Sequence, residues 1–264
     1  MHDARFHRPA TIPEAVAALR AASDGKILAG GQSLIPVMKL RLAQLSDLVS
    51  IAKIETLRGI AVEGNDLVIG AMTTHAEVET SDVAKKKIPS LSRLAAGIGD
   101  PQVRNRGTLG GSLAHADPAA DYAAAALALG ATIETDRRKI AADDFFRGFF
   151  ETALEKDEVI LKVRFPTPTK AAYAKFIQPA SRFAIVGVMV ARTASGVRVG
   201  VTGAGPKPTR NAAMEAALTK DFSAKALESI AVPSTDLTHD LHASAEYRAH
   251  LVGVMARRAV ADCA

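Results

Sequence analysis

The sequence predicts an α+β fold in two parts, residues 1–168 and residues 169–264. Up to residue 166, helix-capping patterns alternate with short apolar strands, which is typical of α/β units. Beyond residue 170, three strand-like segments follow one another directly, and helical spacing then continues to the end of the chain. This second pattern predicts a three-stranded antiparallel sheet with helices. Prolines and lysines punctuate the chain at 166–172, where we place the boundary.

The N-terminal part is predicted to contain two subdomains, about 1–55 and 56–168. The first begins with a capping-box pattern, because Thr11 is followed three residues later by Glu14. The elements expected after this helix are a strand at 26–29, a turn of helix or an irregular wall at 36–42, and a strand at 48–51. Together they predict a βαβ-like unit.

The second subdomain is predicted to mix a hairpin, several helices and two further strands. Thr74 and Glu77 form a second capping-box pattern. The expected elements are a hairpin at 60–63 and 67–70, helices at 91–98 and 121–129, and strands at 131–135 and 158–166. The last strand ends on Pro166, which favours a strand leaving its sheet. The aromatic run 145–150 is interpreted as core or interdomain packing rather than as a substrate pocket.

The C-terminal part is predicted from segments that alternate or carry helical spacing. The strands are expected at 173–177, 185–193 and 196–202, and the helices at 214–218, 224–230 and 244–261.

Composition excludes several classes of function. Cys263 is the only cysteine, so the chain can form neither an internal disulfide nor a four-cysteine zinc or iron–sulfur site. The net charge is +5, but the basic residues are scattered and no tryptophan is present, which argues against nucleic-acid binding. No signal-peptide core and no apolar run of about 18 residues is found, so we expect a cytoplasmic protein without a membrane span.

Two glycine-pair motifs carry the chemistry of the sequence. The first is Ala29-Gly30-Gly31-Gln32-Ser33-Leu34, directly after a predicted strand. The second is Thr108-Leu109-Gly110-Gly111-Ser112, which is followed by Asp117 and Asp121. Glycine pairs let backbone N–H groups approach a phosphate closely, and the carboxylates suit ribose hydroxyls or an adenine amine. The two motifs together predict one ligand with two phosphates, bound from both sides.

Other motifs are weaker. No P-loop pattern is present, and Gly97-Ile98-Gly99 and Gly203-Ala204-Gly205 each lack the third glycine of a Rossmann fingerprint. His239 and His242 have the spacing of metal ligands but no third partner nearby, which favours a solvated surface pair. His115 either lines the ligand or makes only a local hydrogen bond.

The two motifs resemble those of the FAD-binding medium subunits of molybdenum hydroxylases, the family of the carbon monoxide dehydrogenase medium subunit and the xanthine dehydrogenase flavin domain. The resemblance includes Asp100, Arg104 and Asn105 before the second motif and continues weakly through 158–166, 173–176, 206–210 and 244–248. It implies a PCMH-type FAD-binding domain followed by the C-terminal domain typical of these flavoproteins.

The resemblance also implies the positions of the cofactor ligands. Residues 29–34 and 108–112 would hold the FAD pyrophosphate, Asp121 would contact the adenosine part, and Ile98 and Leu161 would lie against the cofactor. Ile177 stands where some members have a basic residue near the flavin ring. The roles of Lys175 and Phe183 near the flavin stay open. No side chain is assigned as catalytic.

The function implied is that of an electron-transfer subunit. A large molybdopterin subunit and a small [2Fe–2S] subunit would be the partners in an (αβγ)₂ complex, and FAD would pass electrons to an external acceptor such as NAD⁺, oxygen or a quinone. The alternatives are a stand-alone flavin reductase on the same fold and a non-catalytic assembly module.

Overall fold

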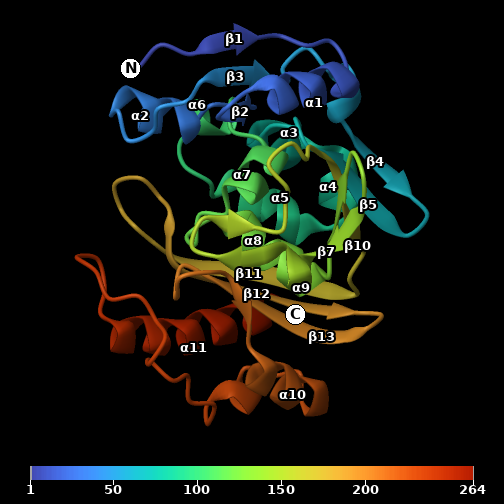
Figure 1. Ribbon diagram of the computed structural model, residues 1–264. Coiled ribbons are helices and arrows are strands. Elements are labelled where there is room, and N and C mark those ends of the chain that lie inside the picture. The colour runs from blue at the N-terminus through green and yellow to red at the C-terminus, as the bar shows by residue number, and fades with distance from the viewer. Residues whose placement is uncertain (1, 264) are drawn as a thin grey trace.

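The computed structural model describes residues 2–263, and its elements form successive layers from the N-terminal to the C-terminal part (Figure 1). The first layer is a three-stranded parallel sheet in the order β1-β3-β2. Its strands are β1 (Arg5–His7), β2 (Gly25–Leu28) and β3 (Asp47–Ser50). The helix α1 (Ile12–Ala21) connects β1 to β2 and begins at Thr11, whose hydroxyl accepts a hydrogen bond from the N–H of Glu14. The α/β unit expected here is therefore present, with β1 in addition.

The segment after the first glycine motif is helical. α2 runs over Leu34–Lys39 and buries Met38. Of the two interpretations of the segment 36–42, the turn of helix is the correct one, although it begins two residues earlier.

The second layer is a five-stranded antiparallel sheet in the order β4-β5-β10-β6-β7. Its strands are β4 (Ile60–Glu63), β5 (Asp66–Gly70), β6 (Thr132–Thr135), β7 (Lys139–Ala141) and β10 (Ile160–Pro166). β10 lies at the centre and pairs with both β5 and β6. The chain leaves this sheet after Pro166, as the proline indicated: Pro166 is the last residue of β10, so its missing N–H affects only the end of the ladder.

Helices fill the space beside this sheet. They are α3 (His75–Thr80), α4 (Asp82–Lys87), α5 (Pro89–Ala96), α6 (Pro101–Arg104), α7 (Leu109–His115), α8 (Asp121–Leu129) and α9 (Ala142–Phe145), and the short hairpin β8 (Phe146–Gly148) and β9 (Glu151–Thr152) follows. The capping box at Thr74 and Glu77 is complete, with both reciprocal hydrogen bonds formed. None of the described helices has a stretch long and apolar enough to cross a bilayer.

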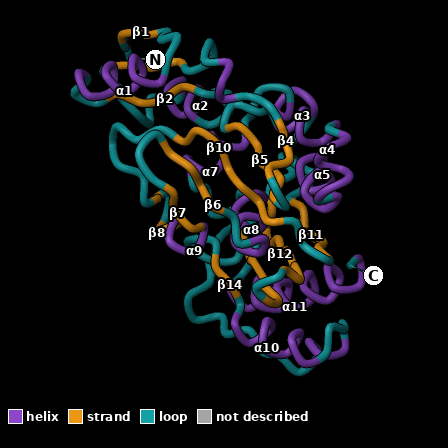
Figure 2. Tube along the Cα trace, turned by 90° about the vertical axis from the view of Figure 1, so that its right-hand side faces the viewer, coloured by secondary structure: helices purple, strands orange, loops and turns teal. Residues whose placement is uncertain are grey.

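Helix α8 lies between the central sheet and the C-terminal sheet (Figure 2). All nine of its residues are buried. Its alanine-rich face lets β13 approach the helix backbone, since a Cβ added at Gly200 would overlap the carbonyl oxygen of Ala124. The small side chains therefore set how closely the two layers pack.

The C-terminal sheet is antiparallel in the order β11-β12-β13-β14. Its strands are β11 (Lys170–Ile177), β12 (Ala184–Thr193), β13 (Gly196–Thr202) and β14 (Thr209–Arg210). The expectation of three strands is wrong by one, because β14 has only two residues and shows no alternation in the sequence. The long helix α11 (Ala245–Asp262) packs on β11 and β12, and α10 (Ala212–Lys220) packs on β13 (Figure 1).

Two further expectations need correction. The helix expected at 224–230 is only the short 3₁₀ turn Lys225–Leu227. Only half of the aromatic run is core: Phe145 and Phe146 are buried, whereas Phe149 and Phe150 are 67% and 44% exposed. Phe150 has a positive φ of 54° and packs against His115, with ring centroids 4.9 Å apart. The local hydrophobicity does not distinguish the buried pair from the exposed one.

Candidate functional site

The described residues line a cavity with a volume of about 760 Å³. It reaches from β2 and the first glycine motif, past α7 and the start of α8, to the loop between β11 and β12. Twelve of the fourteen predicted site residues line it: Ala29, Gly30, Gly31, Gln32, Ser33, Leu34, Ile98, Thr108, Gly110, Gly111, Ser112 and Asp121. Motifs that lie about 75 residues apart in the sequence therefore meet in one cavity.

The first motif is an open turn between β2 and α2. Gly31 has a φ of +75°, a conformation that glycine adopts readily. Gly30 lies against the backbone that precedes the second motif, because a Cβ added there would overlap the carbonyl oxygen of Arg106 and come within 2.9 Å of the Cα of Gly107. Among the described backbone hydrogen bonds, none is donated by the N–H groups of residues 30–33. These amides are available to an anion in the cavity.

The second motif forms the first turn of α7 rather than a loop. Thr108 is its N-cap, and its hydroxyl accepts a hydrogen bond from the N–H of Gly111. The N–H groups of Leu109 and Gly110 donate to the carbonyls of Thr73 and Ala71. Because these amides already donate hydrogen bonds within the protein, the second motif offers a ligand the hydroxyl of Ser112 and not its backbone N–H groups. The free backbone N–H groups lie in the first motif.

Glycine at position 110 allows close packing of the second motif against the segment after β5. A Cβ at Gly110 would lie 2.6 Å from the Cβ of Ala71. A Cβ at Gly111 would lie 2.8 Å from the hydroxyl oxygen of Thr108 and 3.6 Å from the Cβ of Ala29, the latter an ordinary van der Waals distance. The first turn of α7 therefore lies next to the first motif, and both line the cavity.

Asp121 lies at the start of α8 and is held by two residues of β11. The hydroxyl of Tyr173 donates to Oδ1 over 2.7 Å, and Nζ of Lys175 lies 2.8 Å from the same oxygen. Asp121 is only 5% exposed. Burial raises the pKa of its carboxyl above the usual range, and the ammonium of Lys175 and the hydroxyl of Tyr173 act in the opposite direction. The C-terminal part therefore fixes a side chain of the N-terminal part in the cavity wall.

His75 lies at the first turn of α3 and also lines the cavity, a position that the sequence did not single out. Its ring packs against Tyr122 with centroids 5.4 Å apart. Within the described residues, Nδ1 of His75 and the hydroxyl of Tyr122 are buried without a hydrogen-bond partner. Burial, reinforced by the nearby charge of Arg104, lowers the pKa of His75 to about 4. A neutral histidine therefore faces the cavity at neutral pH. The one feature of the sequence that could have pointed to this residue is its position directly after Thr74, the N-cap of α3.

The opposite end of the cavity carries a fixed carboxylate. Glu158 is 4% exposed and accepts hydrogen bonds from Arg138 and Thr135. Arg138 is the main cause that lowers the pKa of Glu158 to about 2. Phe150 and His115 form an aromatic wall nearby, and burial lowers the pKa of His115. His115 thus lines the site, as one of its two interpretations expected.

Two predicted residues do not line the cavity. Leu109 is fully buried in the core around the central sheet, and Leu161 packs against the core beneath the first sheet. Phe183 does line it, together with Ser181 and Arg182 of the β11–β12 loop. Ile177 is 46% exposed and is not part of the lining.

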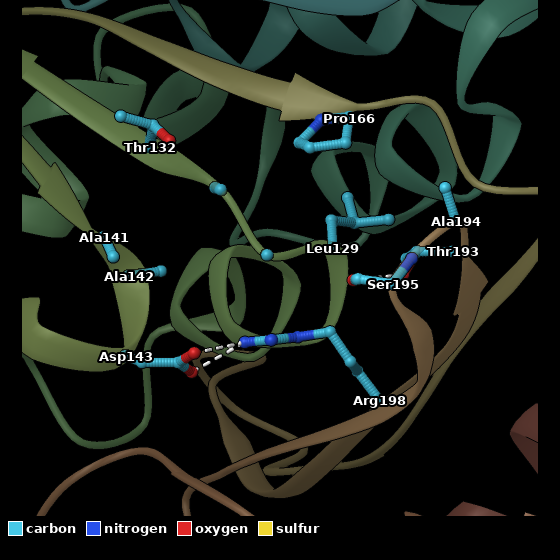
Figure 3. A pocket seen from close by; sticks show the side chains of 12 residues that line it. Leu129, Thr132, Ala141, Ala142, Asp143, Pro166, Thr193, Ala194, Ser195 and Arg198 are labelled. Atoms are coloured by element: carbon cyan, nitrogen blue, oxygen red, sulfur yellow. Dashed lines mark hydrogen bonds and ion pairs between the residues drawn. The ribbon is translucent and has the colours of Figure 1, made fainter. Parts of the chain in front are cut away.

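A second, smaller cavity of about 320 Å³ lies where α8 ends, between β6, β7 and β13 (Figure 3). Its one guanidinium, Arg198, binds both oxygens of Asp143 at 2.6 and 2.8 Å and donates to the carbonyl of Leu127. The charge is already paired, and the remaining lining is largely apolar, so we assign no ligand to this cavity. Among the described residues, no group of three metal-ligating side chains occurs, and His242 packs instead against Phe183.

The larger cavity fits an extended dinucleotide. Its volume lies within the range of about 300–1,000 Å³ that is usual for ligand sites. Free amides of the first motif could bind a pyrophosphate, and Gly110 and Gly111 of the second motif line the same cavity. His75 also lines this cavity, and its Nδ1 has no hydrogen-bond partner among the described residues, so it could form a hydrogen bond with a ligand.

Comparison with known proteins decides the family. Residues 2–168 match the family described as "FAD binding domain in molybdopterin dehydrogenase", and residues 171–263 match "CO dehydrogenase flavoprotein C-terminal domain". The chain belongs to the FAD-binding medium subunits of the molybdenum hydroxylases. FAD is therefore its cofactor, and the chain is the flavoprotein subunit of an oxidoreductase.

Individual relatives of this FAD subunit match along nearly the whole chain. The carbon monoxide dehydrogenase medium chain of Hydrogenophaga pseudoflava is 37% identical, over 97% of this chain and 95% of the relative. The nicotine 6-hydroxylase medium subunit of Paenarthrobacter nicotinovorans is 35% identical, over 98% and 96%. A solved structure of reconstituted CO dehydrogenase from Oligotropha carboxidovorans superimposes with a TM-score of 0.92 at 34% identity, covering 99% of this chain and 97% of that one.

Proposed function

We propose that this FAD subunit receives electrons from [2Fe–2S] clusters of a small partner subunit and passes them through FAD to an external acceptor. The observation that carries the proposal is the convergence of both glycine motifs and the β11–β12 loop on one cavity. The cysteine count supports a partner as the source of the clusters, because a chain with one cysteine cannot form them itself. The relatives that support this assignment have names that call them medium chains or medium subunits of dehydrogenases and hydroxylases.

The residues that would hold the cofactor come from both glycine motifs. The free N–H groups of residues 30–33 would bind the pyrophosphate, with the hydroxyl of Ser112 on the facing wall. Asp121 would accept a hydrogen bond from the adenosine part. Ile98 would supply an apolar contact. Leu109 and Leu161 would act from behind the wall, through packing.

Bound FAD would supply the redox chemistry, and the chain would supply binding, orientation and exclusion of water. No acid–base catalyst is required of the chain. Asp121 is fixed by Tyr173 and Lys175, and Glu158 is fixed by Arg138. These are the marks of residues that orient a ligand rather than of residues that shuttle protons.

The proposal is tested on the full chain alone and then with its partners. The purified chain, titrated with FAD, should acquire a flavin absorption band and quench FAD fluorescence. When it is co-expressed with the small and large subunits, we expect a complex of (αβγ)₂ mass in light scattering. The chemically reduced small subunit should reduce the flavin under anaerobic conditions.

Each alternative has its own signature. A stand-alone flavin reductase would oxidise a reduced nicotinamide rapidly without any partner subunit. An assembly module would show no flavin band even with FAD in excess. Either outcome would overturn the proposal, as would a flavin in the complex that the reduced small subunit cannot reduce.

A further inference from the structure

The side chain of Lys175 joins three separate segments at one end of the cavity. Its ammonium lies 2.8 Å from Oδ1 of Asp121 and donates to the carbonyls of Gly97 and Arg182, each over 2.8 Å. An ammonium has three N–H donors, and all three are used. The side chain is 6% exposed. Such a buried, saturated cation holds its surroundings in one arrangement.

Each carbonyl bound by Lys175 precedes a residue of the cavity wall. Gly97 ends α5 and is followed by Ile98, and Arg182 lies in the β11–β12 loop and is followed by Phe183. One ammonium therefore fixes the backbone of two segments of the cavity wall, one from each part of the chain.

The loop carries strain that requires such a restraint. Arg182 has a φ of +66°, an unfavourable conformation for a residue with a Cβ. Gln178 supports the loop from within, because its side-chain oxygen accepts hydrogen bonds from the N–H groups of Ala180 and Ser181. The bond from Lys175 to the Arg182 carbonyl connects this loop to the N-terminal part, because the same ammonium also contacts the Gly97 carbonyl and Asp121.

We propose that Lys175 is a positioning residue that sets the separation of Ile98 and Phe183, and so the environment of the FAD that lies between them. The proposal rests on the proposed FAD-binding function. Asp121 pairs with the buried ammonium, and the two carbonyls accept its remaining N–H groups, so the three segments are held at a fixed spacing. Loss of Lys175 frees the β11–β12 loop while the rest of the sheet keeps its backbone pairing.

The test uses Lys175→Met in the full chain, with Tyr173→Phe as the matched control. The control removes the other donor to Asp121 from the same strand but makes no contact with the loop. In the FAD-free protein, trypsin should cleave after Arg182 about tenfold faster in Lys175→Met and at the wild-type rate in Tyr173→Phe. At saturating FAD, the visible circular dichroism of the bound flavin should change in Lys175→Met, because its surroundings are no longer fixed.

Far-UV circular dichroism and thermal unfolding check that the variants fold. If Lys175→Met does not fold, Lys175→Met combined with Asp121→Asn removes the buried charge pair as a unit and serves for the cleavage measurement. Cleavage after Arg182 at the wild-type rate in the folded variant would overturn the proposal, and so would an unchanged flavin spectrum. Failure of the wild-type chain to bind FAD would instead count against the proposed function, since the cleavage assay needs no cofactor.

Discussion

Gly30→Ala is expected to weaken FAD binding by separating the two glycine motifs. The added Cβ would overlap the carbonyl oxygen of Arg106 and lie 2.8 Å from its carbonyl carbon and 2.9 Å from the Cα of Gly107. All three atoms belong to the backbone, so no side-chain rotation relieves the contact. The first motif has to move away from the second.

The size of the effect follows from this overlap. Overpacking of a tight contact costs about 1–3 kcal/mol. If that cost falls on the closed arrangement that grips the pyrophosphate, the dissociation constant for FAD rises about 5- to 150-fold, at about tenfold per 1.4 kcal/mol. If the motifs are equally close without FAD, the same cost appears as a loss of folding stability.

Fluorescence titration with FAD and urea unfolding measure the two outcomes. Gly253→Ala in α11 is the matched control, because its Cβ would approach only the tip of Arg257, at 3.4 Å. It should leave FAD affinity unchanged and stabilise the helix by about 0.5–1 kcal/mol. A Gly30→Ala protein with wild-type affinity and wild-type stability would refute the close approach of the motifs. Wild-type affinity with reduced stability would refute its importance for FAD.

Two predictions concern buried titratable groups. The pKa of His75 is about 6.5 in the unfolded chain and about 4 in the folded chain. The unfolded chain therefore binds the proton first as the pH is lowered, and the free energy of unfolding should decrease by about 2 kcal/mol from pH 7 to pH 5. Urea unfolding at both pH values should show this loss in the wild type and not in His75→Gln; equal losses would contradict it. Arg138→Met should destabilise the fold by about 2 kcal/mol at pH 7, because it leaves the Glu158 carboxylate buried without its main partner. The pKa of Glu158 is lowered to about 2, so its stabilising effect should disappear as the pH falls from 4.5 towards 2, and the variant should approach the wild type in acid. If the difference in unfolding free energy between the wild type and Arg138→Met did not change with pH, this would count against the pairing of Arg138 with Glu158.

The elements predicted correctly from the sequence are those with local signals. The capping box of Thr74 and Glu77 needs only residues within one turn, and it forms as expected. The strand β1 and the two-residue strand β14 are too short to show alternation, so they were missed. The central place of β10 depends on two partners from distant parts of the chain, so no local pattern indicates it.

The glycine-pair motifs correctly predicted which segments of the chain line the cavity. Both motifs line the cavity, and Asp121 lies beside them. The exception is the role of the amides in the second motif, because their hydrogen bonds to Ala71 and Thr73 come from a segment outside the motif. The contributions of His75 and Phe150 depend on tertiary contacts, the burial of His75 against Tyr122 and the packing of Phe150 on His115, which local patterns do not encode.

Helix α8 is buried between the central sheet and the C-terminal sheet and packs against both. Its eight residues from Tyr122 to Leu129 share one apolar cluster with Ile133 and Val163 of the central sheet and with Met189 and Ala191 of β12. Removing the C-terminal part would expose this face of a helix whose first residue, Asp121, lines the larger cavity. The two parts therefore cannot unfold independently, and calorimetry of the full chain should show a single cooperative transition. Although residues 2–168 and 171–263 match two separate family models, we expect them to unfold together in one transition.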